Sequence, residues 1–140
     1  MSIFIDTGIW IGYFNASDEK AERSAEIIED IQRGKFGVAW TSLFVVNELF
    51  TFLERRTRNI QLAIDAATIV LGNREGLKPF AKIHPVSYEN CVKALELATK
   101  YADRMISFTD LMSLVICVDL NIESIATYDR HFQGLIHAVN

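Results

Sequence analysis

The segment of residues 107–132 constrains the fold most, because a helix pattern is followed at once by a strand pattern. Ser107 is a typical helix-capping residue, and Asp110 lies in the expected first turn. Apolar residues then recur at helical spacing, at Leu111, Leu114, Val115 and Val118. The β-prone run of residues 122–127 follows, and Asp129 stands just past its end. This order is expected of one half of an α/β unit.

The same alternation of patterns recurs along the whole chain. We predict strands over residues 3–5, 36–40, 81–86, 122–127 and 136–139. We predict helices over residues 9–14, 17–33, 42–56, 59–71, 87–101 and 107–120. Strands that alternate with helices favour an α/β fold, a parallel sheet of four to five strands with helices on both faces.

The apolar positions predict which helix faces point inward. For the helix of residues 17–33 the inner positions are Ala21, Ala25, Ile28 and Ile31. For the helix of residues 87–101 they are Val92, Leu95, Ala98 and Tyr101. The helix of residues 42–56 is apolar on more than one face, so we expect it to be buried on two sides or to meet a partner. Glu48 is the carboxylate within that apolar surface.

Length and charge limit the remaining choices. The chain has 140 residues, half of them apolar, which suits one domain over residues 1–140 with a full core. A net charge of −4 argues mildly against binding nucleic acid with the whole surface, but it leaves room for a local basic strip. Cys91 and Cys117 lie far apart in helix-like patterns, which indicates buried free thiols in a reducing compartment. The start of the chain lacks the basic segment of a signal peptide, and no apolar run is long enough for a membrane span. We therefore expect a soluble, cytoplasmic protein.

Four acidic residues are expected at one edge of the sheet. Asp6 and Asp129 follow predicted strands, and Asp110 and Glu48 lie early in predicted helices. In a right-handed βαβ arrangement, strand ends and helix starts share the carboxyl edge, where open α/β sheets bind ligands. Each acid alone has a structural explanation, as a helix cap, a complement to a helix dipole or the partner of an arginine. Their convergence favours a functional site.

Carboxylates crowded into one pocket repel one another, and a divalent cation relieves that repulsion. A site made of carboxylate oxygens, without a set of Cys or His ligands, suits Mg²⁺ or Mn²⁺. Such a metal can polarise a phosphodiester and lower the pKa of a bound water, so hydrolysis of a nucleic-acid backbone is the natural chemistry.

The sequence resembles PIN-domain proteins along nearly its whole length, and among them the compact VapC-type toxin ribonucleases. The matching motifs are the strand that ends in Asp6-Thr7, then Asn47-Glu48-Leu49, Ser107-Phe108-Thr109-Asp110, and Thr127-Tyr128-Asp129-Arg130-His131-Phe132. The resemblance implies a PIN-like fold and a metal-dependent endoribonuclease that acts on RNA. It implies a catalytic and metal-binding set of Asp6, Glu48, Asp110 and Asp129, with Thr7, Ser107 and Thr127 as supporting groups. It also implies a homodimer and a small antitoxin partner. Gly8 and Leu111 depart from the residues common in the family.

Other polar residues leave alternatives open. Arg104 and Arg130 flank the acidic edge and are candidates for holding substrate phosphate. The cluster of Arg55, Arg56 and Arg58 could compensate a helix C-terminus, or could contact RNA or an acidic partner. His84, His131 and His137 show no ligand spacing, and we interpret them as structural. His131 lies near Asp129 and could also touch substrate, but a structural role is favoured for it too. The alternative function is a non-catalytic PIN-like protein that acts as a protein or RNA interaction module.

Overall fold

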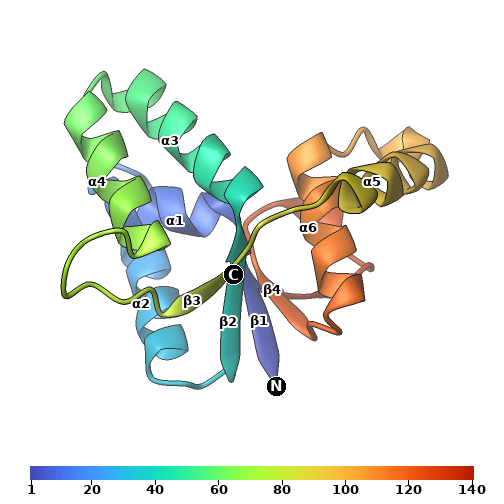
Figure 1. Cartoon of the computed structure of the whole chain (residues 1–140), viewed down its shortest axis with the longest axis horizontal. Coiled ribbons are helices and arrows are strands. Elements are labelled where there is room, and N and C mark those ends of the chain that lie inside the picture. Colours follow the sequence, from blue (N-terminus) through green and yellow to red (C-terminus); the bar gives the residue numbers. More distant parts are fainter.

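A single parallel sheet organises the protein (Figure 1). The structure, a computed structural model, describes residues 1–140. The strands are β1 (Ser2–Ile5), β2 (Val38–Ser42), β3 (Ala81–His84), β4 (Ser124–Ala126) and β5 (His137–Val139). They lie in the order β3-β2-β1-β4-β5, and every neighbouring pair is parallel. The predicted five-stranded parallel α/β sheet is therefore confirmed.

Six α-helices cover the two faces of the sheet. They are α1 (Thr7–Phe14), α2 (Ala21–Gln32), α3 (Leu43–Thr57), α4 (Ile60–Leu71), α5 (Tyr88–Lys100) and α6 (Phe108–Asp119), with 3₁₀ turns η1 (Ala102–Arg104) and η2 (Arg130–Phe132). Figure 1 shows α1 to α4 on one side of the sheet and α5 and α6 on the other. None of these helices is both long and apolar enough to pass through a bilayer.

Side-chain caps fix where most of these helices begin. Ser42, Asn59, Ser87 and Ser107 each accept a hydrogen bond from the backbone N–H three residues later. Such a cap contributes about 1 kcal/mol by satisfying a donor that the helix leaves free. Because β2 runs directly into α3 at Ser42, the cap also sets the position of the following helix relative to the carboxyl edge of the sheet.

The central strand β1 anchors the core. Ile3, Phe4 and Ile5 are fully buried, as predicted for a strand covered on both faces. β2 begins at Val38, two residues later than predicted, because Gly37 adopts a φ of +74° against the start of the chain. A Cβ on Gly37 would lie 2.2 Å from the carbonyl oxygen of Met1, so only glycine fits there.

Helix α2 begins later than predicted, and a different set of its residues is buried. It starts at Ala21, not near residue 17, because the Asp18 side chain accepts the Lys20 N–H at 2.8 Å and closes a turn instead. Its buried residues are Ser24, Ile27, Ile28 and Ile31, whereas Ala25 is exposed. Ser24 is internal because α2 crosses α1 closely, and a Cβ on Gly12 would lie 2.1 Å from the Ser24 hydroxyl oxygen.

Helix α5 exposes residues that were predicted to be internal. Val92 is 40% and Leu95 is 60% exposed, and the buried positions are Asn90 and Ala94. The Asn90 side chain explains this rotation, because it donates to Oδ2 of Asp119 on α6 at 3.2 Å and accepts the Ser87 N–H. On α6 the same interface leaves Val118 71% exposed, also against prediction.

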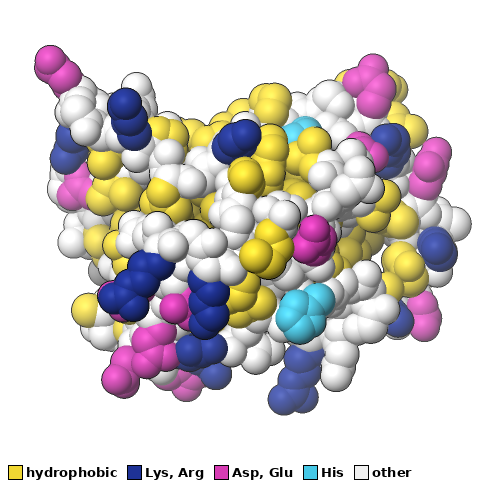
Figure 2. Space-filling model, turned by 90° about the horizontal axis from the view of Figure 1, so that it is seen from below, with side chains coloured by type: hydrophobic (Ala, Val, Ile, Leu, Met, Phe, Trp, Pro, Cys, Tyr) yellow, Lys and Arg dark blue, Asp and Glu magenta, His cyan; other side chains and the backbone are white.

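The strands begin at the lower edge of the sheet in Figure 1 and end beneath α3 and α6. Figure 2 views the molecule from below, so that it shows the edge where the strands begin. Basic and acidic side chains lie next to each other on this face. Near the start of β2, Lys35 pairs with Asp30 at 2.6 Å, and Arg33 pairs with Glu29. Glu29 and Asp30 at this amino edge are therefore each paired with a basic neighbour.

Candidate metal centre

The four predicted acids extend from segments that meet at the carboxyl edge of the sheet. Asp6 follows β1, and Asp129 lies three residues beyond β4, the neighbouring strand. The backbone N–H of Asp6 continues the ladder by donating to the carbonyl of Ala126 at 3.0 Å. Asp110 lies in the first turn of α6, and Glu48 lies in the second turn of α3. Parallel strand order therefore brings residues from both ends of the chain to one place.

Hydrogen bonds tie these segments together at the edge. The buried Thr127 hydroxyl donates to Oδ2 of Asp6 at 2.7 Å and accepts the Asp129 N–H at 3.0 Å. Ser107 accepts the Asp110 N–H at 3.2 Å and so begins α6 beside the acids. Thr127 thus links two of the acids directly, and Ser107 fixes a third.

Asp110, Asp129 and His131 form the tightest group. One potential ligand atom from each lies within 4.8 Å of the others. Nδ1 of His131 lies 3.1 Å from Oδ1 of Asp129 and 3.7 Å from Oδ2 of Asp110. His131 was interpreted as structural, but it belongs to this group. Its position two residues after Asp129, in a turn that Asp129 caps, is the sequence signal that could have indicated it.

The electrostatics show that all four acids act on one another. The pKa of Asp110 is raised to about 8, chiefly by burial, and also by the charge of Asp6, a hydrogen bond with Asp129 and the charges of Asp129 and Glu48. Burial also raises the pKa of Asp6 to about 6, although the Thr127 and Thr7 hydrogen bonds oppose this, and Glu48 and Asp129 add repulsion. At neutral pH the metal-free protein therefore keeps a proton on Asp110.

The structural explanations for single acids apply only in part. Asp129 does cap η2, because its Oδ1 accepts the His131 N–H at 2.8 Å. Asp6 precedes α1 but accepts no capping hydrogen bond. Glu48 forms no ion pair with an arginine, and the only basic group near Asp110 is His131. The cluster is thus not neutralised from within the chain.

A model of the PIN domain matches residues 3–135. The chain belongs to the PIN-domain family. The structure of VapC20 from Mycobacterium tuberculosis, a sarcin–ricin loop cleaving toxin, is 25% identical to this PIN-family chain, with a TM-score of 0.80 over 95% of this chain and 94% of that one. No curated protein matches the sequence.

Two further structures share the fold at lower identity. VapBC2 from Rickettsia felis, bound to a promoter DNA fragment, is 17% identical, with a TM-score of 0.68 over 100% of this chain and 98% of that one. FitAcB from Neisseria gonorrhoeae is 15% identical, with a TM-score of 0.68 over 99% of this chain and 96% of that one. The parallel sheet of this PIN-family chain is thus common to both.

The donor atoms of the PIN-family chain fit a hard divalent cation. Oδ1 of Asp6 and Oγ1 of Thr7 are buried and lack hydrogen-bond partners. A buried polar atom without a partner is costly, and an ion in the cluster would satisfy the carboxylate oxygen. The oxygen-rich set Asp6, Glu48, Asp110 and Asp129 has the chemistry that Mg²⁺ and Mn²⁺ prefer.

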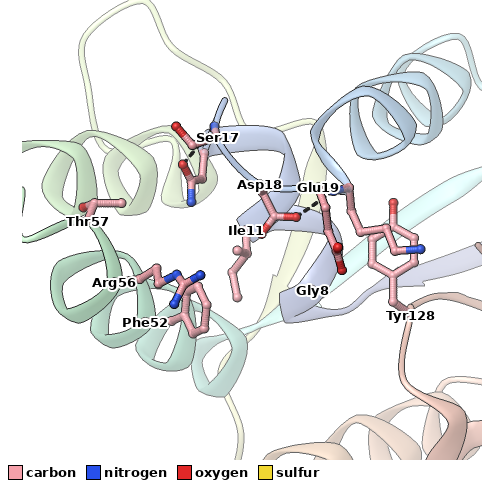
Figure 3. Close-up of a pocket in the computed structure, with 11 residues that line it drawn as sticks. Gly8, Ile11, Ser17, Asp18, Glu19, Phe52, Arg56, Thr57 and Tyr128 are labelled. Carbon is pink, nitrogen blue, oxygen red and sulfur yellow. Dashed lines mark hydrogen bonds between the residues drawn. The ribbon is translucent and has the colours of Figure 1, made fainter.

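Two hollows adjoin the acids of the PIN-family chain. One is a groove of about 540 Å³ between α3 and the start of α6, lined by Asn47, Glu48, Thr51, Phe52, Arg55, Arg56 and Thr109. The other is a cavity of about 870 Å³, which shares Phe52 and Arg56 with the groove. In Figure 3 these two residues project into one side of the cavity and Tyr128 lies at the other, with Gly8 between them. Gly8 is two residues beyond Asp6 and Tyr128 adjoins Asp129, so this cavity lies close to both acids along the chain.

Proposed function

We propose that this protein is a metal-dependent endoribonuclease of the PIN-domain family and the toxin of a toxin–antitoxin pair. One observation carries the proposal: acids from four distant segments meet at the carboxyl edge, and their mutual repulsion and burial raise the pKa of Asp6 and Asp110. A divalent cation is the natural partner of such a cluster. Membership of the family and the likeness to VapC20, a toxin that cleaves the sarcin–ricin loop, support an RNA substrate.

In the proposed site Asp6, Glu48, Asp110 and Asp129 hold Mg²⁺ or Mn²⁺. The metal would supply a water of lowered pKa and polarise the phosphodiester to be cleaved. Thr127 orients Asp6 by donating to its Oδ2, which leaves Oδ1 free for coordination. Asp110 gives up its proton when the ion is bound, because a carboxylate must be deprotonated to act as a ligand.

The supporting residues hold these acids in place. Ser107 begins α6 so that Asp110 faces the edge, and Thr7 lies buried beside Asp6. We propose that Arg104 and Arg130 bind the phosphates of the substrate, because both side chains are exposed and form no ion pair. We also propose that residues 1–140 form a single domain, which carries all of these residues.

A small antitoxin and a second copy of the chain are the proposed protein partners. The VapBC2 and FitAcB structures share the fold, and VapC20 is itself a toxin. We place the protein in the cytoplasm, where its RNA substrate would be. A short open reading frame directly upstream of the coding sequence would support the toxin role.

Incubation of the purified protein with mixed cellular RNA tests the proposal. We expect internal cleavage in Mg²⁺ or Mn²⁺, none in EDTA, and recovery when either metal is added back. An Asp6→Asn variant purified in parallel controls for contaminating nucleases. Cleavage that persists both in EDTA and in the variant would contradict the proposal. RNA binding without cleavage in any metal would favour the interaction module instead.

A further inference from the structure

The arginines of this chain fall into two classes. Three form ion pairs with carboxylates: Arg23 with Glu26, Arg33 with Glu29 and Arg74 with Asp65. The other five form none, although the chain carries a net charge of −4: Arg55, Arg56, Arg58, Arg104 and Arg130. All five are exposed. An exposed arginine needs no carboxylate partner, so what matters is where these five lie.

Two of the unpaired arginines lie on one side of the acids. Arg55 and Arg56 are in the last turn of α3 and line the groove that contains Glu48. Arg55 is seven residues beyond Glu48, which places it about 10 Å further along the same helix face. Thr109, the neighbour of Asp110, forms the opposite wall. The groove therefore leads from this pair of arginines, the α3 flank, to the acids.

Two more of the unpaired arginines, Arg104 and Arg130, lie on the other side of the acids. Arg104 in η1 and Arg130 in η2 line a hollow of about 360 Å³ together with His131 and Gln133. The Arg104 guanidinium donates to the Gln133 carbonyl at 3.3 Å and lies 5.3 Å from the centre of the Tyr101 ring. This pair of arginines is the η flank. His131 connects it to the acids, because His131 also contacts Asp129.

A structural role does not explain both flanks. Arg55 and Arg56 could complement the C-terminus of α3. Arg104 and Arg130 lie in 3₁₀ turns of three residues, where no comparable dipole exists, and no carboxylate pairs with either. The contacts of Arg104 with the Gln133 carbonyl and the Tyr101 ring hold its side chain but do not neutralise its charge, and Arg130 makes neither contact. What the two flanks share is their position around the acids. A chain of phosphates that passes the acids would meet positive charge on both sides.

We infer that a single RNA strand crosses the carboxyl edge from the α3 flank to the η flank, with phosphates bound on both sides of the bond to be cleaved. This inference rests on the proposed function and adds the path of the substrate. An acidic protein segment is a weaker fit, because it would have to place carboxylates on both sides of a cluster of like charge. The strand path requires nucleotides on both sides of the cut, so that cleavage is internal.

The salt dependence of RNA binding tests the proposed path of the strand without requiring cleavage. Fluorescence anisotropy would measure binding of a labelled single-stranded RNA in EDTA over a range of salt concentrations. Each phosphate contact contributes about 0.7 to the slope of log K against log [salt] for single strands. We expect Arg55→Gln/Arg56→Gln and Arg104→Gln/Arg130→Gln each to reduce the slope by about 1.4, and the quadruple variant to reduce it by the sum, about 2.8.

The matched control is Arg33→Gln/Arg74→Gln, which removes the same net charge from arginines that are already paired. We expect it to leave the slope unchanged. The inference is overturned if either flank variant behaves like the control, or if the quadruple variant loses no more than one double variant. It is also overturned if the flank variants weaken only an antitoxin complex. Cleavage in Mg²⁺ is scored separately, so a failed path and a failed nuclease give different results.

Discussion

Carboxylates have opposite surroundings at the two edges of the sheet. At the amino edge Glu29 and Asp30 each lie beside a basic side chain on the surface. At the carboxyl edge Asp6 and Asp110 are buried and face other acids. A surface ion pair contributes at most about 1 kcal/mol and is easily dispensed with. Buried like charges instead destabilise the fold, and groups with strongly shifted pKa values cluster at functional sites. Removing a carboxylate should therefore have opposite effects at the two edges.

The largest expected effect is the loss of cleavage in Asp110→Asn. The change keeps the shape of the side chain but removes a charged ligand, so RNA cleavage in Mg²⁺ should fall by more than about 100-fold. Initial rates on a labelled RNA, with Glu29→Gln as the control at the amino edge, would measure this. Full activity in Asp110→Asn would remove Asp110 from the site.

The pH dependence of stability separates the two edges next. The folded pKa values of Asp6 and Asp110, about 6 and about 8, lie above the ordinary value of 3.8, so the folded metal-free protein binds these protons more tightly than the unfolded chain. The contribution of these two protons to the free energy of unfolding is fully present below pH 3.8. It is lost as the pH rises through 6 and 8, and the loss is a few kcal/mol at most.

Chemical denaturation in EDTA between pH 5 and pH 9 would measure that loss. Asp110→Asn should be more stable than the wild type at pH 9, and its advantage should become steadily smaller toward pH 5, because the folded wild type is protonated at Asp110 at pH 5 and ionised there at pH 9. Identical pH profiles for the two proteins would show that Asp110 does not hold the proton assigned to it.

Metal should reverse the instability of the carboxyl edge alone. An ion that binds only the folded protein stabilises it by about 2.7 kcal/mol at 100 times its Kd. Mn²⁺ should therefore raise the Tm of the wild type and of Glu29→Gln equally. The rise should be strongly reduced in Asp110→Asn. A thermal melt in millimolar Mn²⁺ and in EDTA measures this, and no shift in the wild type would count against a metal site.

The smallest effect should follow a change at the amino edge. Glu29→Gln removes the exposed partner of Arg33, and we expect less than about 1 kcal/mol of lost stability by urea denaturation. Cleavage should be unchanged. A larger loss would show that the amino edge depends on its charges more than the comparison assumes.

Local signals in the sequence were sufficient to predict most of the helices and strands and to place the acids at one edge of the sheet. Ser42, Ser107 and the short run at Ile3–Ile5 each fix an element through nearby residues, so strand ends and helix starts could be predicted. Once parallel order is assumed, Asp6 and Asp110 follow at one edge without further information.

The rotation of helices could not be predicted in this way. Which face of α2 is internal depends on its close approach to Gly12, and which face of α5 is internal depends on the bond between Asn90 and Asp119. These contacts join residues distant in sequence, and hydrophobic periodicity does not encode them. A structural role was favoured for His131 for a related reason, since its closeness to Asp110 depends on a turn that Asp129 closes.

The order of the strands has a consequence for biosynthesis. The central strand β1 is made first, but its neighbour β4 lies at Ser124–Ala126 of a chain of 140 residues. Asp6 therefore meets Asp129 only after the whole segment between β1 and β4 has been made, and a chain that stops before Asp129 lacks one of the four acids.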